Sequence, residues 1–242
     1  LDRYVPMILP DGSWLHGIND ASVRIGLRLS KDETIVRTPF EVRHMGSKYP
    51  IFSFDFIGAK KGILPTSYDY LRLEGRMQYR LNLPPVGYSR LMLEGGKIFG
   101  KVPYLLLKLH EGNGTYFYDR YAFSCMNFYE FSSDAWISFF YEHHFNGFLL
   151  GRVPLLKKLN WREVFVFKGV YGTLSARNDG SLPNTKAVML FPVGMSSVEH
   201  PYLETGFGIE NIFRLLRVDC IWRLTHHRAV PGLSIPTFTV NF

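Results

Sequence analysis

The sequence predicts an all-β protein, an antiparallel transmembrane β-barrel. Most of the chain alternates apolar with polar residues, as in residues 71–83, where Leu71 and Leu73 alternate with Arg72 and Glu74. A strand points successive side chains to opposite faces, so this pattern gives one apolar and one charged face. In a soluble sandwich the apolar face packs the core, whereas in a membrane barrel it meets lipid and the charged face lines the lumen.

Segment length and aromatic placement favour the barrel. The alternating segments exceed the about 5–6 residues of a typical globular strand and approach the about 9–11 of a tilted membrane-spanning strand. Their polar faces carry charges of both signs, as a barrel lumen does. Aromatic side chains lie near the strand ends, like the interfacial girdles of a membrane barrel: Phe52, Tyr79, Phe99, Tyr141, Phe145, Trp222 and Phe242.

Ten strands are expected along the chain. They cover residues 23–30, 36–43, 51–56, 71–83, 89–100, 135–147, 161–174, 202–210, 215–225 and 237–242. The segment 161–174 alternates poorly and is apolar on both sides. Residues 1–20 are expected to lead into the barrel, which occupies residues 21–242.

The connections are expected to alternate between the two ends of the barrel, with the shorter ones on the periplasmic side. Counting back from a periplasmic C-terminus places 211–214, 147–160, 84–87 and 44–49 on that side. The outer side then receives 228–234, 176–200, 58–67 and one 35-residue loop, 100–134. A loop of that length within a compact domain is usually functional.

Composition excludes several other classes of protein. The net charge of +7 comes from basic residues spread singly along strands, so a nucleic-acid partner is not expected. Cys125 and Cys220 form no CxxC motif, which leaves zinc and redox chemistry without support, although a disulfide between them stays open. No apolar run is long enough for a membrane-spanning helix. A chain that starts at Leu1 is expected to be a processed protein or a fragment.

No catalytic, cofactor-binding or metal-binding residue is expected. The histidine pairs 143–144 and 226–227 each present only one ring per face of a strand, which is too few for a metal site. No GxSxG motif or triad spacing is present. A lipid-facing esterase would need a serine beside His143, and the sequence places none there. Residues 152–161 fit either a short amphipathic helix at a membrane surface or an ordinary apolar turn.

The charges on the polar faces are expected to line the lumen. Their arginines could select anions, but a network of arginine–carboxylate pairs is the preferred interpretation. The predicted lumen charges are Arg72, Glu74, Arg76, Arg80, Glu142, Glu204, Glu210, Arg217, Asp219 and Arg223.

Long stretches of the chain resemble known families. The segment "YLETGFGIENIFRLLRVDCIWRLTHH" resembles the closing strands of the BamA/TamA superfamily of outer-membrane barrels. Four segments are more similar to one uncharacterised bacterial outer-membrane family: "GSKYPIFSFDF", "GGKIFGKVPYLLLKLHEGNGTYFYDRYAF", "YEFSSDAWISFFYEHHFNGFLLGRVPLLKKLNWREV" and "PYLETGFGIENIFRLLRVD". In that family a barrel of unknown function follows a carboxypeptidase-regulatory-like domain. The resemblance covers residues 46–242.

The resemblance implies a sixteen-stranded barrel of the bacterial outer membrane, of which this chain supplies the last ten strands. It also implies assembly, translocation or surface display of envelope components, with outer-membrane lipid and other envelope proteins as partners and without a cofactor. A passive channel or uptake barrel is the alternative, and an outer-membrane esterase is third.

The resemblance places loop 100–134 where the superfamily has a loop that enters the lumen. The superfamily loop carries a Val-Arg-Gly motif, but this loop has none and contains a single arginine, Arg120. Lys168 stands where the superfamily strand has an acid. A charge pair of reversed polarity is therefore expected, in which Lys168 meets Asp119 rather than Glu111 or Glu130. The alternative pairs Lys168 with Glu142 or Glu204 and leaves the loop as an external lid.

Overall fold

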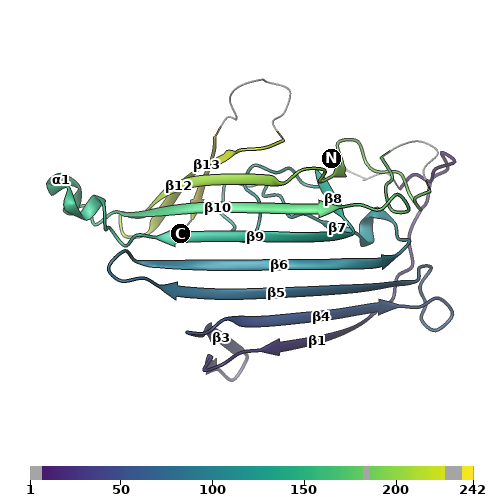
Figure 1. Cartoon of the computed structure of the whole chain (residues 1–242), viewed down its shortest axis with the longest axis horizontal. Helices are drawn as coiled ribbons and strands as arrows, with labels where there is room; N and C mark the ends of the chain where they lie inside the picture. The colour runs from purple at the N-terminus through teal and green to yellow at the C-terminus, as the bar shows by residue number, and fades with distance from the viewer. Residues whose placement is uncertain (1–6, 182–185, 227–235, 242) are drawn as a thin grey trace.

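The computed structural model describes residues 7–181, 186–226 and 236–241. The described chain is almost entirely antiparallel β-structure, which confirms the all-β prediction. Nine strands form one sheet in the order β1-β4-β5-β6-β9-β10-β12-β13-β14. Figure 1 shows β1, β4, β5, β6, β9 and β10 running side by side. The bounds of these strands are β1 Val23–Leu29, β4 Ile51–Ala59, β5 Tyr70–Asn82, β6 Tyr88–Gly100, β9 Ala135–His144, β10 Arg162–Thr173, β12 Tyr202–Ile212, β13 Leu216–Arg223 and β14 Thr237–Asn241.

The sheet is open, with β1 at one edge and β14 at the other, so the closed barrel is not observed. The edge of β14 is partly covered by the connection between β6 and β9. Val240 accepts a backbone hydrogen bond from Tyr118 at 2.9 Å and donates one to Tyr116 at 2.7 Å. Among the described residues, no strand pairs with the outer edge of β1.

The expected strand over residues 36–43 is wrong. This segment folds as a separate hairpin of β2 (Thr34–Arg37) and β3 (Val42–Gly46), so the main sheet has nine strands and β1 pairs directly with β4. The reason is the sequence Thr38-Pro39-Phe40. Proline cannot donate to a ladder, and the Thr38 N–H bonds the Glu41 carbonyl at 2.9 Å to close a turn.

The connections alternate between the two ends of the sheet from β4 onward. The turns 83–87 and 213–215 lie at one end, hereafter the short-turn end, together with the longer connection 145–161. That connection contains η2 (Leu150–Arg152) and α1 (Pro154–Lys157), and α1 projects beyond the strands in Figure 1. In the described part of the chain, no helix has both the length and the apolar character needed to cross a membrane.

The connection between β6 and β9, residues 101–134, packs against one face of the sheet and is called the docked loop. It contains η1 (Tyr104–Leu106), β7 (Lys108–Leu109) and β8 (Phe131–Ser133), and β8 also pairs with β11 (Ser196–Ser197) from the connection between β10 and β12. Phe123 and Met126 of this loop pack with Met92, Phe140 and Tyr202 of the sheet in one apolar cluster. The sheet face beneath the docked loop is called the inner face.

Candidate functional site

The burial of the two sheet faces is inverted relative to a soluble protein. On β13, Arg217, Asp219 and Arg223 are buried, whereas the alternating residues Val218 and Trp222 are only half-buried. Charged side chains are almost never buried without partners, and here Arg217 and Asp219 bond each other while Arg223 bonds Glu130 of the docked loop. The charged face is therefore the inside of this structure.

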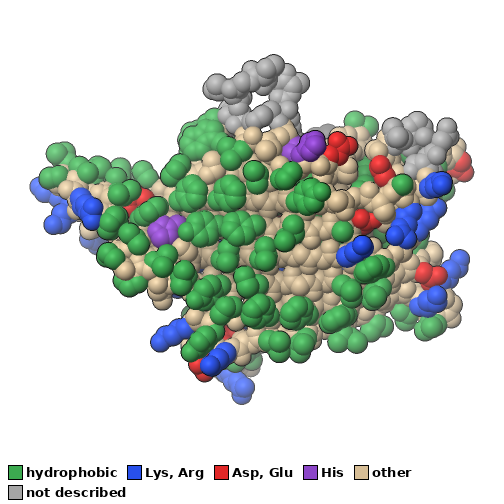
Figure 2. All heavy atoms as spheres, in the orientation of Figure 1, with side chains coloured by type: hydrophobic (Ala, Val, Ile, Leu, Met, Phe, Trp, Pro, Cys, Tyr) green, Lys and Arg blue, Asp and Glu red, His purple; other side chains and the backbone are tan. Residues whose placement is uncertain are grey.

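The opposite face is apolar and exposed, and it is called the outer face. Figure 2 shows hydrophobic side chains spread across the strands, with charged groups gathered mainly at the ends and margins. Phe54, Ile137 and Phe207 are 38%, 49% and 60% exposed. Single exposed apolar residues are ordinary on soluble proteins, but a continuous apolar surface marks a partner or a membrane.

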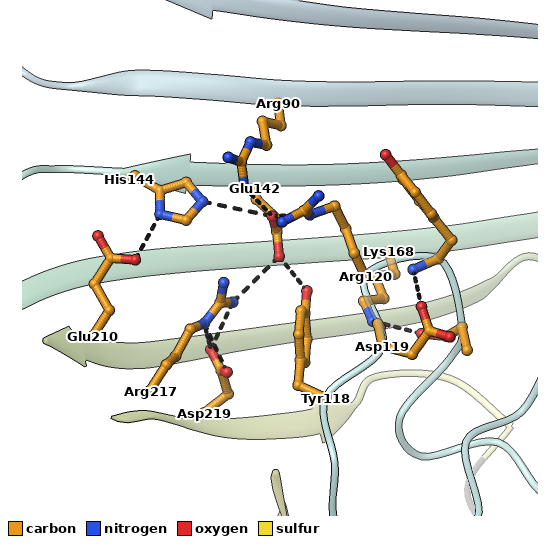
Figure 3. Close-up of polar contacts among 12 residues, drawn as sticks. Arg90, Tyr118, Asp119, Arg120, Glu142, His144, Lys168, Glu210, Arg217 and Asp219 are labelled. Carbon is orange, nitrogen blue, oxygen red and sulfur yellow. Dashed lines mark hydrogen bonds and ion pairs between the residues drawn. The ribbon is translucent and has the colours of Figure 1, made fainter. Parts of the chain in front are cut away.

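Glu142 of β9 is the centre of the inner-face polar network (Figure 3). Its side chain is 2% exposed. Tyr118 donates its hydroxyl to Oε1 at 2.5 Å, Arg120 donates Nε to Oε2 at 2.8 Å, and Arg217 Nη2 lies 3.3 Å from Oε1. Two of these donors come from the docked loop, so one carboxylate connects the loop to β9 and β13.

Tyr118 lies between two cations on the inner face. The Arg217 guanidinium is 4.4 Å from its ring centroid and the Lys168 ammonium is 4.5 Å from it. Arg217 also bonds both carboxylate oxygens of Asp219, through Nε at 3.0 and 2.8 Å. Gly208 faces Asp219 across the strands, where a Cβ would collide with the carboxylate. Tyr118 therefore contacts the inner face through its ring, which lies near Arg217 and Lys168, as well as through its hydroxyl, which bonds Glu142.

Lys168 faces inward and is 1% exposed, as the charge-pair prediction requires. Its Nζ donates to the backbone carbonyls of Asp119 at 2.8 Å and Ala122 at 2.5 Å. The Asp119 carboxylate instead accepts the Tyr121 N–H. The structure thus brings Lys168 and Asp119 together, but the contact with Asp119 is to its main chain. Glu142, assigned to Lys168 in the alternative, is bound by Arg120.

Glu204 of β12 forms a second anchor for the docked loop. It accepts the N–H groups of Ser124 at 2.9 Å and Cys125 at 2.7 Å, and the Tyr202 hydroxyl at 2.5 Å. It also pairs in register with Lys168. An uncompensated carboxylate at this depth would be costly, and the two backbone donors reduce that cost.

Other predicted lumen charges also find partners within the inner face. Their contacts are Arg72 with Glu74, Arg76 with Glu94 at 2.5 Å, Arg223 with Glu130 at 2.7 Å and Glu210 with His144 at 3.0 Å. Arg80 is different, because its contact is with the ring of Tyr88 at 4.3 Å.

Burial changes the acid–base character of two groups in the docked loop. It lowers the pKa of His110 to about 3, so the ring is neutral and hydrogen-bonded to the Ser133 hydroxyl at 2.9 Å. It raises the pKa of the Cys125 thiol to about 11, which suppresses the thiolate. Cys125 and Cys220 are both free, so the disulfide left open by the sequence is not formed.

A serine does lie beside His143, contrary to the sequence prediction. Ser89 is the cross-strand partner of His143, and its Oγ is 2.8 Å from Nδ1 while Nε2 is 3.0 Å from the Val86 carbonyl. Ser89 is 5% exposed and His143 is 8% exposed, and the ring of Phe145 covers the histidine at 4.3 Å. The pair resembles a nucleophile with an oriented base, but it is closed to a substrate of any size.

The other candidate segments are placed as follows. Within the described residues no three metal-binding side chains converge. Residue 227 of the second histidine pair and the expected loop 228–234 lie outside the described residues. The segment 152–161 does contain the short helix α1, with Leu155 83% exposed. Phe242, the expected terminal aromatic, is also outside the described part of the chain.

Sequence reasoning missed Tyr118 and Tyr202, which join buried carboxylates on the inner face. Both adjoin predicted charges, Tyr118 in the Tyr-Asp-Arg stretch and Tyr202 two residues before Glu204. A buried tyrosine hydroxyl needs a hydrogen-bond partner, so a tyrosine next to a predicted buried acid was an available signal.

Comparison with known proteins yields one family. The model for the C-terminal domain of a family of unknown function, DUF5686, matches residues 17–176, which is 160 of the 242 residues. The matched region runs from before β1 to just past β10 and includes the whole docked loop. No curated protein matches the chain.

Proposed function

Because the chain belongs to the DUF5686 family of unknown function, we propose its role from its own geometry: it forms part of a β-barrel in the bacterial outer membrane. In this proposal the outer face contacts lipid and the inner face lines the lumen. One observation carries it, namely that Phe54, Ile137 and Phe207 are exposed while Glu142 and Asp219 are buried.

A soluble sandwich would require the opposite arrangement. Its core would form between apolar faces, and its charged faces would meet water. Here the apolar groups of the inner face pack with the docked loop, and the outer face has no partner among the described residues. Lipid would cover such a face over the full length of the strands.

The open edges of the sheet require further strands in a membrane. Unpaired backbone groups cannot face lipid, so nine strands with an unpaired edge at β1 and a partly covered edge at β14 cannot stand there alone. We propose that additional strands close the barrel to the sixteen implied by the BamA/TamA resemblance. The 242-residue segment expressed alone then aggregates, and a stable, heat-modifiable monomer of this segment would reveal a smaller closed barrel.

Within the outer membrane, we propose a role in assembly, translocation or surface display of envelope components. The docked loop supports this role over a passive channel, because it packs against the inner face. It is tied to β9, β10 and β12 by the contacts of Glu142, Lys168 and Glu204, and to β13 by the bond from Arg223 to Glu130. A channel needs a continuous water-filled path, which a docked loop obstructs.

Two measurements separate these functions. Deleting the gene and quantifying the outer-membrane proteome should show loss of a defined set of envelope proteins. In planar bilayers, the full-length protein should show no steady open conductance. An unchanged proteome together with steady conductance would identify a channel instead.

A further inference from the structure

Arg80 and Arg90 on the inner face lack the close carboxylate contacts that Arg72 and Arg76 have on the same pair of strands. Within the described residues no acidic group lies within ion-pairing distance of Arg80. Arg90 has one such contact, at 3.9 Å to Glu142 Oε2, and that oxygen already accepts Arg120 at 2.8 Å. The network of charge pairs therefore accounts for the neighbouring arginines and leaves these two in excess.

Arg80 and Arg90 also lie directly opposite each other. They are register partners on the antiparallel pair β5 and β6, and both project from the inner face. Like charges at such positions destabilise a sheet. The Tyr88 ring lies 4.3 Å from the Arg80 guanidinium and 5.2 Å from that of Arg90, and His144 stacks on the same ring at 4.5 Å. This stacking orients the two guanidiniums without neutralising them.

These two arginines border an open cavity at the short-turn end of the sheet. The cavity has a volume of about 1000 Å³ and lies between the β2–β3 hairpin and the docked loop. A second cavity of about 360 Å³ shares Arg90 and Arg120 and adds Arg162 and Arg214. Its acidic wall residue, Glu210, is bound to His144 at 3.0 Å. The wall of the larger cavity also holds Glu33, which is bonded to Arg28, Glu142, which is bonded to Arg120, and the exposed Asp32. Arg80 and Arg90, which none of these acids bonds closely, thus face a space large enough for a small organic anion.

The chemistry of the wall selects the kind of anion. A guanidinium presents a planar fork that bonds two oxygens of a carboxylate or phosphate. A carboxylate has two oxygens and is satisfied by one fork, whereas a phosphate has enough oxygens for two forks that approach from adjacent strands. Tyr121 and Phe140 add an aromatic wall to the same cavity.

We propose that the cavity bordered by Arg80 and Arg90 binds a phosphate group carried by a small ligand. The group is either that of a soluble phosphate or that of a lipid headgroup, and the chemistry of the arginines is the same for both. This inference goes beyond the proposed function, since it needs only the inner face and its cavity.

The test titrates three probes into the full-length protein in detergent at low ionic strength: inorganic pyrophosphate, dihexanoylphosphatidylglycerol and succinate. Saturable binding is expected for pyrophosphate or the lipid, with a Kd well below that of succinate. Tighter binding of pyrophosphate identifies a soluble phosphate as the source, and tighter binding of the lipid identifies a headgroup. No saturable binding of either phosphate, or equal binding of succinate, would overturn the proposal.

Matched variants locate the site. Arg80→Gln and Arg90→Gln should each raise the Kd about tenfold or more, because a hydrogen bond to a charged group is lost. Arg72→Gln is the control, since Arg72 lies on the same face of β5 but is bonded to Glu74. An equal loss of affinity in that control contradicts the assignment.

A second readout separates binding from a role in the fold. Removing one of two facing like charges should leave the Tm of the empty protein unchanged or higher. A Tm that falls in both Arg80→Gln and Arg90→Gln would mean that the pair serves the fold, and the proposal would be wrong.

Discussion

Replacing Glu142 with glutamine should release the docked loop from the sheet. Glu142 is 2% exposed and accepts bonds from Tyr118 at 2.5 Å and Arg120 at 2.8 Å, with Arg217 at 3.3 Å. Glutamine keeps one acceptor oxygen but removes the negative charge, so the Arg120 and Arg217 guanidiniums lose their shared anion. Breaking a buried ion pair by removing one partner costs about 3–5 kcal/mol. Asp219 still bonds Arg217, so the lower half of that range is expected.

Hydrogen exchange in the full-length protein measures this change directly. The Tyr118 N–H, which bonds the Val240 carbonyl at 2.9 Å, reports on loop docking. A loss of about 3 kcal/mol lowers its protection by about a hundredfold. Glu111→Gln is the matched control, because this loop glutamate is 65% exposed and its nearest cation, Lys108, is 3.7 Å away. Equal protection in the wild type and the Glu142→Gln variant would refute the central place of Glu142.

The remaining predictions concern the same loop and the covered serine. Because burial lowers the pKa of His110 to about 3, the undocked loop binds a proton below about pH 6.5 that the docked loop excludes. Docking is therefore complete above that pH and weaker by about 2 kcal/mol at pH 5, measured by exchange, and His110→Gln should abolish the dependence. In a double-mutant cycle, the effects of Lys168→Ala and Asp119→Ala on the free energy of unfolding should be additive, because the lysine bonds the Asp119 main chain. A coupling energy above about 0.5 kcal/mol would show instead that the two side chains interact. A fluorophosphonate probe should not label Ser89, which is 5% exposed, and labelling lost in Ser89→Ala would instead identify an esterase.

The sequence was sufficient to predict most of the sheet because the pattern that identifies a strand is local. Alternation within 71–83 or 215–225 depends only on side chains two residues apart, and β5 and β13 form there. The failure at 36–43 has a local cause as well. Pro39 interrupts an alternating run, and proline within such a run argues against a through-strand.

The candidate site could be predicted only in part, because its contacts are distant in sequence. Arg120 meets Glu142 from 22 residues away, and Cys125 meets Glu204 from 79 residues away. The sequence predicts that Lys168 needs a partner if it faces inward, and the structure places it inward against the docked loop. A backbone carbonyl exists at every residue, so no sequence pattern distinguishes the carbonyls of Asp119 and Ala122 as its acceptors.

Likewise, the lack of close acidic partners for Arg80 and Arg90 can be recognised only when the strand register is known. In the sequence Arg80 and Arg90 resemble Arg72 and Arg76 of β5, because all four alternate with apolar residues. The cross-strand register places Arg80 opposite Arg90, whereas Arg76 lies opposite Glu94. A shift of the register would have given different partners, so the charge balance of the inner face follows from the turn at 83–87 as much as from composition.

Spin-label accessibility tests most directly whether the outer face contacts lipid. Single nitroxides are placed at adjacent residues of β4 and β5, at Phe54 and Ser53 and at Met77 and Arg76, in full-length protein without native cysteines and reconstituted in bilayers. These pairs share a depth but project to opposite faces. Collisions with oxygen should exceed those with a water-soluble nickel chelate at Phe54 and Met77, and the order should reverse at Ser53 and Arg76. Preferential collision with the nickel chelate at Phe54 and Met77 would contradict a lipid-facing apolar surface.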